Sequence, residues 1–346
     1  MSAPIALLDL LACPDCHGAL SRTADELHCQ GCGQTHPIVR GPAGSHEIPR
    51  LLPKHERDLD IEHETELLVR PEFVPCLTRL IECLASDQVV LDIGAGERET
   101  DDPRVLRLDL RFTPRVDLVG DAHYLPLQDN SVDVVLAGAV FEHLADPFAA
   151  AREIFRVLKP GGMAIADCAF VFPYHGYPAS YFNASGDGMR QAFRDFREVK
   201  VEVPPWFMPA FGLQVLLGEW VRMCQPKTDN DRQFLEAVRA LDRFDLNSLN
   251  ECFSPEDALR IASGTAFLGL KQPGGDENVV PPPAMELWQS DAELQARFPD
   301  PAALLTTLWK DEPDSFVCWA ATEGRKRSES LARWYEERTS VVKSLD

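Results

Sequence analysis

The chain is poor in positive charge. It carries 34 lysines and arginines against 55 aspartates and glutamates, a formal net charge of −21 at pH 7 over 346 residues. Such an excess of carboxylates repels nucleic-acid phosphates, and residues 1–53 offer no basic patch. The composition therefore argues against nucleic acid as the partner. With 45% hydrophobic residues, the chain can still bury one large core and a small module.

Long uncharged apolar runs are also missing. The most apolar segment covers residues 206–223. It contains Gln214, Glu219 and Arg222, so it predicts a lid or core helix, with a helix in a membrane interface as the alternative. Near the N-terminus, Asp9 interrupts a short apolar run that no basic region precedes, so we expect no secretory signal. The sequence predicts a cytoplasmic protein without a transmembrane segment.

A third absence concerns glycine. The apolar run 89–93 contains Asp92 and turns through Gly94 and Gly96, which lets the backbone approach a ligand closely. A dinucleotide-binding fingerprint needs a further glycine at position 99, and this chain has a glutamate there. Carboxylates around the turn would repel a pyrophosphate, whereas S-adenosylmethionine (SAM) carries an ammonium and a sulfonium and no phosphate. The turn therefore predicts a SAM site.

Two more acidic residues follow apolar segments downstream. Asp109 ends the expected strand 105–109, and Asp121 lies at the end of the expected strand in segment 116–122. The carboxyl ends of parallel strands meet at the sheet edge where such folds bind ligands. A carboxylate there can hold a ribose diol, and another can accept a hydrogen bond from an adenine amino group. The spacing therefore predicts three acids along one edge.

Four segments in order resemble the class I SAM-dependent methyltransferases. They are Asp92-Ile93-Gly94-Ala95-Gly96, residues 120–127, Phe141-Glu142-His143-Leu144 and residues 158–162. The resemblance implies a Rossmann-like α/β fold in which Asp92 and the glycine backbone hold the methionine end, Asp109 the ribose, and Asp121 and Ala122 the adenine. The cofactor contacts expected together are Asp92, Gly94, Ala95, Gly96, Asp109, Leu110, Asp121, Ala122, Ala137 and Gly138.

The chain departs from this family after the glycine turn. Only residues 97–104 separate Gly96 from the next expected strand. We therefore expect the usual first helix to be shortened or replaced by a loop, which leaves the partner of the cofactor's carboxylate open. An α/β core that has lost its cofactor is the alternative interpretation.

Four of the ten cysteines form two pairs near the N-terminus. Cys13 and Cys16 make one CxxC pair, and Cys29 and Cys32 make the second after twelve intervening residues. Four such thiolates can bind one tetrahedral Zn²⁺ and leave no open position, so we expect a structural metal. Two disulfides are the alternative, which a reducing compartment disfavours. With its flanks, the segment resembles the zinc-ribbon activator subunit of tRNA and release-factor methyltransferases, here joined to the enzyme.

An aromatic loop follows the fifth expected strand. Residues 170–178 include Tyr174 and Tyr177, and Tyr181 comes shortly after. The loop resembles a segment that lies over the acceptor pocket in methyltransferases of glycan and secondary-metabolite clusters, although Ser180 replaces its usual acidic residue. We expect the three tyrosines to contact the acceptor. A loop whose tyrosines fill the core edge is the alternative.

Two histidines are candidates for catalysis. Methyl transfer depends largely on positioning, and a hydroxyl acceptor also needs a base, which is most often histidine near neutral pH. His143 follows the fourth expected strand and His175 lies in the aromatic loop, so either can point at the methyl group. A cofactor-packing role is the alternative for His143.

These features predict an α/β fold class: a seven-stranded methyltransferase sheet with an N-terminal zinc ribbon and a helical insertion before the last strand. The expected parts are a zinc-ribbon module (1–53), a linker (54–70), a SAM-binding core (71–203), an insertion or lid (204–312), and the last strand, residues 315–321, with a C-terminal helix (313–346).

The leading functional interpretation is SAM-dependent O-methylation of a small molecule or glycan in a biosynthetic pathway. A base methyltransferase of rRNA or tRNA is the second, because zinc modules precede some of those enzymes, although the acidic charge argues against it. The third is a non-catalytic scaffold that binds SAM, or a partner through the zinc ribbon. A protein partner or a second copy of the chain would then bind through the zinc ribbon or the insertion.

Overall fold

The computed structural model describes residues 7–40, 46–57, 73, 75–82, 84–113, 115–176, 179–244 and 246–271. The N-terminal module comprises the short helix α1 (Leu7–Leu10) and the strands β1 (Leu20–Arg22), β2 (Glu26–Cys29), β3 (Thr35–Arg40) and β4 (Glu47–Leu51). These strands pair antiparallel in succession. The 3₁₀ turn η2 (Lys54–Glu56) follows β4.

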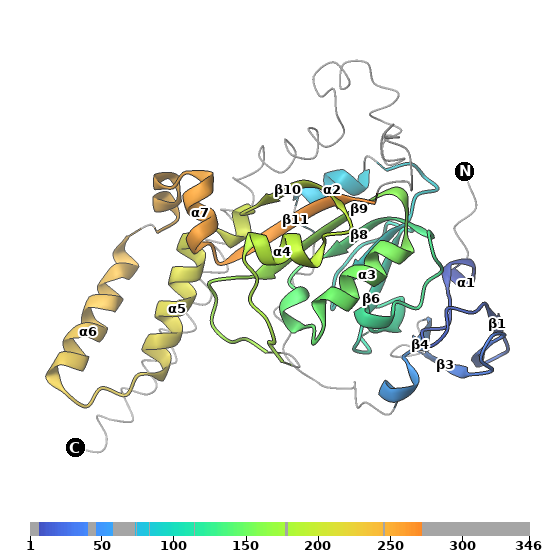
Figure 1. Ribbon diagram of the computed structural model, residues 1–346. Coiled ribbons are helices and arrows are strands. Elements are labelled where there is room, and N and C mark those ends of the chain that lie inside the picture. The colour runs from blue at the N-terminus through green and yellow to red at the C-terminus, as the bar shows by residue number, and fades with distance from the viewer. Residues whose placement is uncertain are drawn as a thin grey trace, which may run out of the picture.

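The remaining strands form the main sheet (Figure 1). They are β5 (Val90–Ile93), β6 (Val105–Asp109), β7 (Leu118–Gly120), β8 (Val132–Ala137), β9 (Leu158–Ala169), β10 (Arg197–Glu202) and β11 (Gly264–Leu270). The strand order across the whole sheet is β1-β2-β3-β4-β7-β6-β5-β8-β9-β11-β10. Strands β5 to β9 are parallel, and β11 runs antiparallel between β9 and β10. The predicted α/β fold is confirmed.

The order reverses at β5, which lies between β6 and β8. In open sheets of this kind the crevice at such a reversal, outside the carboxyl ends of the strands, is where ligands bind. At the far side, β4 pairs in parallel with β7. The N-terminal module and the main domain therefore share one continuous sheet.

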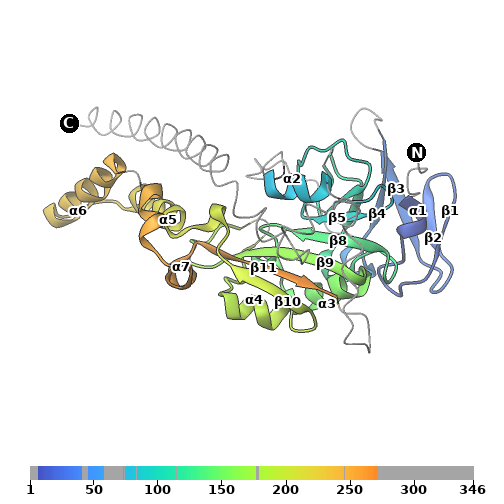
Figure 2. The same ribbon diagram turned by 90° about the horizontal axis from the view of Figure 1, so that it is seen from above.

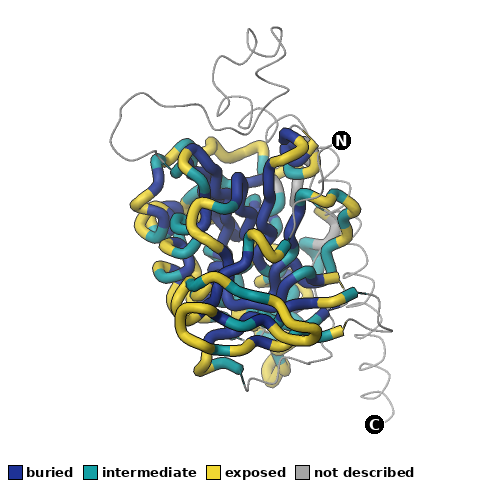
Figure 3. The backbone as a smooth tube through the Cα atoms, turned by 90° about the vertical axis from the view of Figure 1, so that its right-hand side faces the viewer, coloured by how far each residue is buried: buried dark blue, intermediate teal, exposed yellow. Residues whose placement is uncertain are grey.

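Helices cover both faces of the main sheet (Figure 2). Helix α2 (Pro75–Glu82) packs on one face, and α3 (Pro147–Val157) and α4 (Gly186–Ala192) lie on the other. Helix α3 begins where Asp146 accepts a hydrogen bond from the backbone of Ala149, and it buries Ile154 and Val157. The strands between these layers are buried (Figure 3).

A helical segment projects from the sheet between β10 and β11 (Figure 1). It contains α5 (Pro209–Met223), α6 (Asp229–Arg239) and α7 (Pro255–Ile261). The shorter 3₁₀ turns are η3 (Ala122–Tyr124), η4 (Phe141–His143), η5 (Pro205–Phe207), η6 (Ala240–Arg243) and η7 (Leu246–Cys252). None of the helices in the described ranges has the length and hydropathy needed to span a bilayer.

One strand lies where the sequence predicted part of the insertion. Residues 264–270 were expected inside the insertion, but they form β11, every residue of which is buried between β9 and β10. The helical insertion therefore ends before residue 264. Two glycines in this strand weaken the local strand signal. The strand expected at 315–321 and the expected C-terminal helix lie outside the described residues.

Candidate functional site

The turn after β5 forms the centre of the candidate site. Gly94 and Gly96 have φ values of 68° and 54°, a region that favours glycine. A Cβ atom on Gly94 would lie 2.5 Å from Cγ2 of Val140, so a side chain cannot fit there. The amide of Ala95 donates to the carbonyl of Leu108 over 3.1 Å, which ties the turn to β6. The sequence thus builds a tight glycine turn at the reversal of the strand order.

Asp92 lies beneath this turn and is 1% exposed. Its Oδ2 accepts a hydrogen bond from Nε of Arg98 over 2.6 Å. Its Oδ1 is buried and has no hydrogen-bond partner among the described residues. Burial raises the pKa of Asp92 to about 6, although Arg98 acts in the opposite direction. The site therefore offers an unsatisfied carboxylate oxygen to a positively charged or hydrogen-bonding ligand.

Asp109 ends β6 next to the same turn. Its Oδ2 accepts from the amide of Gly96 over 2.9 Å, and its Oδ1 accepts from the amide of Arg111 over 2.9 Å. The Arg111 guanidinium forms an ion pair with this carboxylate at 3.3 Å. Leu110 follows at the strand end. The structure thus places Asp92 and Asp109 on adjacent strands around the glycine turn, as the sequence predicted.

Asp121 lies after β7, the next strand in the sheet. It accepts hydrogen bonds from the amide and the Nδ1 of His123, at 2.7 and 2.6 Å. Burial alone would raise the pKa of Asp121, but these hydrogen bonds and one with Glu56 lower it. Ala122 is buried beside it. All three predicted acids therefore lie along one sheet edge.

Glu56 brings the N-terminal module to this edge, which the sequence did not indicate. Burial and the neighbouring Asp121 raise the pKa of Glu56 to about 8. The turn that carries Glu56 is held by Asp15, which accepts from the amide of Lys54 over 2.8 Å and from Arg57 over 2.9 Å. Asp15 lies between Cys13 and Cys16 in the sequence. The first cysteine pair and the Asp121 region are thus connected by a short chain of contacts.

Ala137 and Gly138 lie at the end of β8, on the other side of the reversal. A Cβ atom on Gly138 would lie 3.8 Å from Oδ2 of Asp167. Asp167 also accepts hydrogen bonds from the amide of Ala139 and from Nε1 of Trp206. Sequence reasoning missed Asp167, because an acid inside a long apolar strand gives no signal of its own.

His143 and His175 lie close together, and Glu142 joins them. The two imidazole rings are 5.1 Å apart, and His175 Nε2 lies 3.5 Å from Oε1 of Glu142. Nδ1 of His143 lies 2.8 Å from the carbonyl of Ala179, and Nδ1 of His175 lies 3.0 Å from that of Pro173. The hydrogen bond to Glu142 raises the pKa of His175. Glu142 itself is 1% exposed and was not singled out from the sequence.

The aromatic loop lies over the histidine pair. The ring of Phe172 is 4.8 Å from that of His175 and 5.7 Å from that of Phe211 in α5, so loop and insertion meet there. Tyr174 and Tyr181 are exposed, at 75% and 55%. Tyr177 lies outside the described residues. The structure therefore brings together the histidines and the loop, with the two described tyrosines at the surface.

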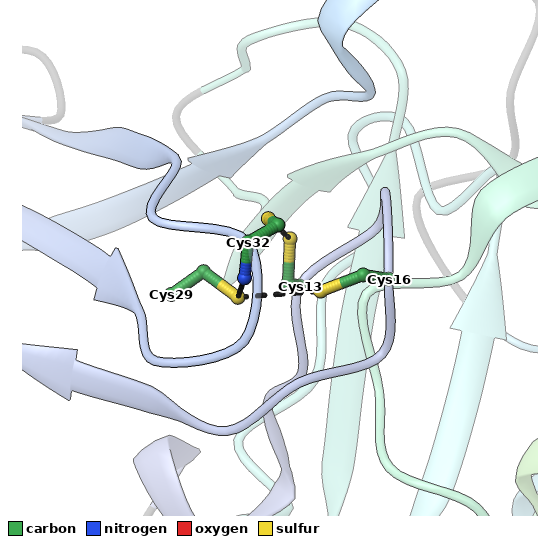
Figure 4. A group of neighbouring side chains, drawn as sticks. All are labelled: Cys13, Cys16, Cys29 and Cys32. Carbon is green, nitrogen blue, oxygen red and sulfur yellow. Dashed lines mark hydrogen bonds between the residues drawn. The ribbon is translucent and has the colours of Figure 1, made fainter.

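The four N-terminal cysteines converge on one point (Figure 4). All four sulfur atoms lie within 4.8 Å of one another. The Cys13–Cys32 and Cys16–Cys29 sulfur pairs are 3.7 and 3.4 Å apart, close to the edge of about 3.8 Å expected for a tetrahedral ZnS₄ site. The donor set therefore fits Zn²⁺. His36, which the sequence analysis passed over, is buried with Nε2 3.6 Å from the Cys13 sulfur.

Two parts of the chain, the α/β domain and the cysteine-rich module on the same sheet, match known families. Residues 80–166 match the methyltransferase domain family, and residues 5–41 match the Trm112p-like protein family. The two resemblances drawn from the sequence motifs are thereby confirmed for these residues.

Curated relatives match parts of the chain. A methyltransferase of Mycobacterium tuberculosis is 40% identical over 94 residues, which cover 22% of this chain and 38% of that protein. A 37.1 kDa protein in transposon TN4556 of Streptomyces fradiae is 45% identical over 53 residues, 15% of each chain. The chain thus spans well under half the length of these relatives.

Solved structures align with part of the chain at low identity. One is a complex of the Haloferax volcanii Trm112 methyltransferase activator with a methyltransferase (TM-score 0.32, 17% identity, 57% of this chain and 89% of that chain). Another is a SAM-dependent methyltransferase from Archaeoglobus fulgidus (TM-score 0.34, 16% identity, 56% and 91%).

Proposed function

We propose that the chain is a SAM-dependent methyltransferase that acts on a hydroxyl group of a small molecule or glycan. The observation that carries the proposal is the row of Asp92, Asp109 and Asp121 at three neighbouring strand ends beside the Gly94–Gly96 turn. The net charge of −21 disfavours the rRNA or tRNA alternative. The alternative to an enzyme is a scaffold protein that does not turn over SAM. A methyl-transfer assay distinguishes the enzyme from the scaffold.

The residues present fit SAM. When bound, SAM supplies a methyl group on a positively charged sulfur. Asp92 offers a buried, unpartnered Oδ1 that we assign to the methionine ammonium. The positive φ of Gly94 and its contact with Val140 require a glycine at the turn that would hold this end of the ligand. We assign Asp109 to the ribose hydroxyls and Asp121 to the adenine amino group. Leu110, Ala122, Ala137 and Gly138 would line the same crevice.

We infer that the histidine pair removes the proton of the acceptor hydroxyl. Transfer to a hydroxyl forms an O–CH₃ bond, breaks the S–CH₃ bond and releases one proton. His143, with Nδ1–H donated to the Ala179 carbonyl, presents its Nε2 lone pair as the proton acceptor. The ring of His175 lies 5.1 Å away and pairs with Glu142, whose carboxylate would stabilise the positive charge that develops. Tyr174, Tyr177 and Tyr181 are proposed acceptor contacts.

We also propose that Cys13, Cys16, Cys29 and Cys32 bind one structural Zn²⁺ per chain. The support is the sulfur geometry, together with the amides of Gly31 and Cys32, which donate to the Cys29 sulfur over 3.3 and 3.4 Å. Such hydrogen bonds stabilise a thiolate. Four thiolates would close the coordination sphere, so the metal would hold the module together and take no part in transfer.

Replacing Asp109 with alanine tests the cofactor assignment. We expect SAM affinity to fall by roughly 10- to 100-fold, since hydrogen bonds to a charged group contribute about 1.5–3 kcal/mol. Titration calorimetry with SAM and with its demethylated product measures this loss. Asp187→Ala is the control, because that side chain is 91% exposed on α4. Unchanged affinity in Asp109→Ala would place the ribose elsewhere, and tight binding of NADH by the parent would refute the SAM proposal.

SAM affinity should also depend on pH through Asp92. Its pKa of about 6 in the free chain means that the carboxylate is mostly protonated at pH 5 and ionised at pH 7. The SAM ammonium, with a pKa of about 8, stays charged over this range. We therefore expect binding roughly tenfold weaker at pH 5 than at pH 7. In Asp92→Asn this dependence should vanish; a parent affinity that is flat from pH 5 to 7 would contradict the assignment.

A further inference from the structure

Arg98 lies in the loop that replaces the expected first helix, two residues after Gly96. Its Nε donates to Asp92 over 2.6 Å, and its side chain is 11% exposed. The ring of Phe73 lies 4.6 Å from the guanidinium carbon. The cation is therefore held beside the glycine turn, at the carboxyl end of β5.

The loop leaves an electrostatic gap that Arg98 can fill. A helix that begins after such a turn offers backbone amides and a positive dipole end to an anion. Residues 97–104, all of them described, contain no helix. Within this loop, Arg98 supplies a positive charge and forms an ion pair with Asp92. The planar fork of a guanidinium suits a carboxylate.

We propose that Asp92 and Arg98 together recognise the amino-acid end of the cofactor. The Asp92 carboxylate would bind the α-ammonium, and the Arg98 guanidinium would bind the α-carboxylate. This inference rests on the proposed function, because it takes SAM as the cofactor. Nothing in the sequence motifs assigned a partner to the α-carboxylate, so Arg98 is an added binding residue.

The charges of the two partners are complementary. An α-amino acid carries its cation and its anion on one carbon, and the Asp92–Arg98 pair presents the opposite charges in direct contact. A buried ion pair is costly to break unless both of its charges gain new partners. A zwitterion supplies both, whereas a ligand without the carboxylate offers a new partner to Asp92 alone. The buried, unpartnered Oδ1 of Asp92 marks where the ammonium would lie.

The pairing predicts selectivity for the carboxylate. The two test ligands are SAM and decarboxylated SAM, which differ only in this group, and the third is 5′-methylthioadenosine, which lacks the whole amino-acid end. We expect the parent to bind SAM at least about 10-fold more tightly than decarboxylated SAM. In Arg98→Gln the two affinities should agree within about threefold, and the affinity for 5′-methylthioadenosine should match that of the parent.

The controls separate binding from structure. Arg115→Gln removes a 46%-exposed arginine paired with Glu99 in the same region, and it should leave all three affinities unchanged. Arg98→Lys keeps the charge and should retain part of the selectivity. If a thermal melt shows that Arg98→Gln does not fold, the test uses the parent and Arg98→Lys instead. The affinity ratio of SAM to decarboxylated SAM in these two chains then supports or refutes the inference.

Three results would overturn the inference. The first is a parent that binds SAM and decarboxylated SAM equally. The second is an Arg98→Gln chain that weakens both ligands by the same factor, which would mean that Arg98 only supports Asp92. The third is a parent that binds none of the three ligands, and this result alone would also refute the proposed function.

Discussion

Replacing Cys29 with serine is expected to remove the zinc from the chain and to unfold residues 7–40. Residues 7–40 bury few large apolar side chains, mainly Leu11 and Leu27, so apolar packing alone contributes little to the stability of this segment. Binding of structural Zn²⁺ provides about 10–16 kcal/mol in zinc-finger peptides at pH 7, and this binding energy is folding energy. Elemental analysis should find one zinc per parent chain and roughly none in the variant. Hydrogen exchange should show lost protection in residues 7–40.

The site at β5 and β6 should survive this change. Asp92 and Asp109 are placed by the main sheet, so SAM affinity in Cys29→Ser should stay within about threefold of the parent at a temperature below the main unfolding transition. Cys252→Ser is the matched control, because Cys252 is exposed and lies outside the cluster. A Cys29→Ser chain that keeps one zinc and full protection would refute the metal assignment.

The second large effect concerns His143. His143→Ala should lower turnover by roughly 100-fold or more while SAM binding stays intact, because general-base catalysis contributes about 10²–10⁴-fold. The loss should shrink at high pH, where a hydroxyl acceptor ionises without help. Turnover is measured as transfer from methyl-labelled SAM to hydroxylated small molecules and glycans. His28→Ala is the control, since His28 pairs with Glu26 on the N-terminal module.

His175→Ala should have a smaller effect than His143→Ala. His175 pairs with Glu142, which raises its pKa and favours its charged form, so it is the poorer proton acceptor at neutral pH. Changes at Phe172 or Phe211 should leave SAM binding intact and reduce transfer, because in the proposed site these rings, which contact each other beside His175, would position the acceptor. If both histidine variants keep full turnover across pH, base catalysis by histidine is wrong and positioning alone drives the transfer.

The placement of the three acids at one sheet edge could be predicted because its signals are local. A buried strand, an acid and a glycine turn occur together in a few residues, and β5, β6 and β7 each have an acid at or near their end, Asp92, Asp109 and Asp121. The two CxxC pairs are equally local. In each case the chemistry is carried by neighbours in the sequence, so spacing alone places the side chains.

The rest depends on contacts between distant segments. Glu56 meets Asp121, and Asp167 meets Trp206, only because the sheet order brings those elements together. Arg98 is a candidate binding residue only because it forms an ion pair with Asp92, and this contact cannot be inferred from the composition. Strand β11 was missed because tertiary pairing with β9 and β10 overrides its weak local pattern.

The parallel pairing of β4 with β7 has a consequence for biosynthesis. The four cysteines leave the ribosome before any strand of the main sheet, so the module can acquire metal early and alone. The last strand of the module, β4, pairs with β7, and β5 and β6 are synthesised before β7. Strand β4 therefore cannot pair with the main sheet until all three strands have been made. During that interval β4 presents an unpaired edge, which invites association between nascent chains. If the proposed zinc is in short supply, the module that carries β4 folds later, and the nascent chain stays prone to association for longer. Metal supply is therefore expected to affect the yield of native protein more than the activity of the folded chain.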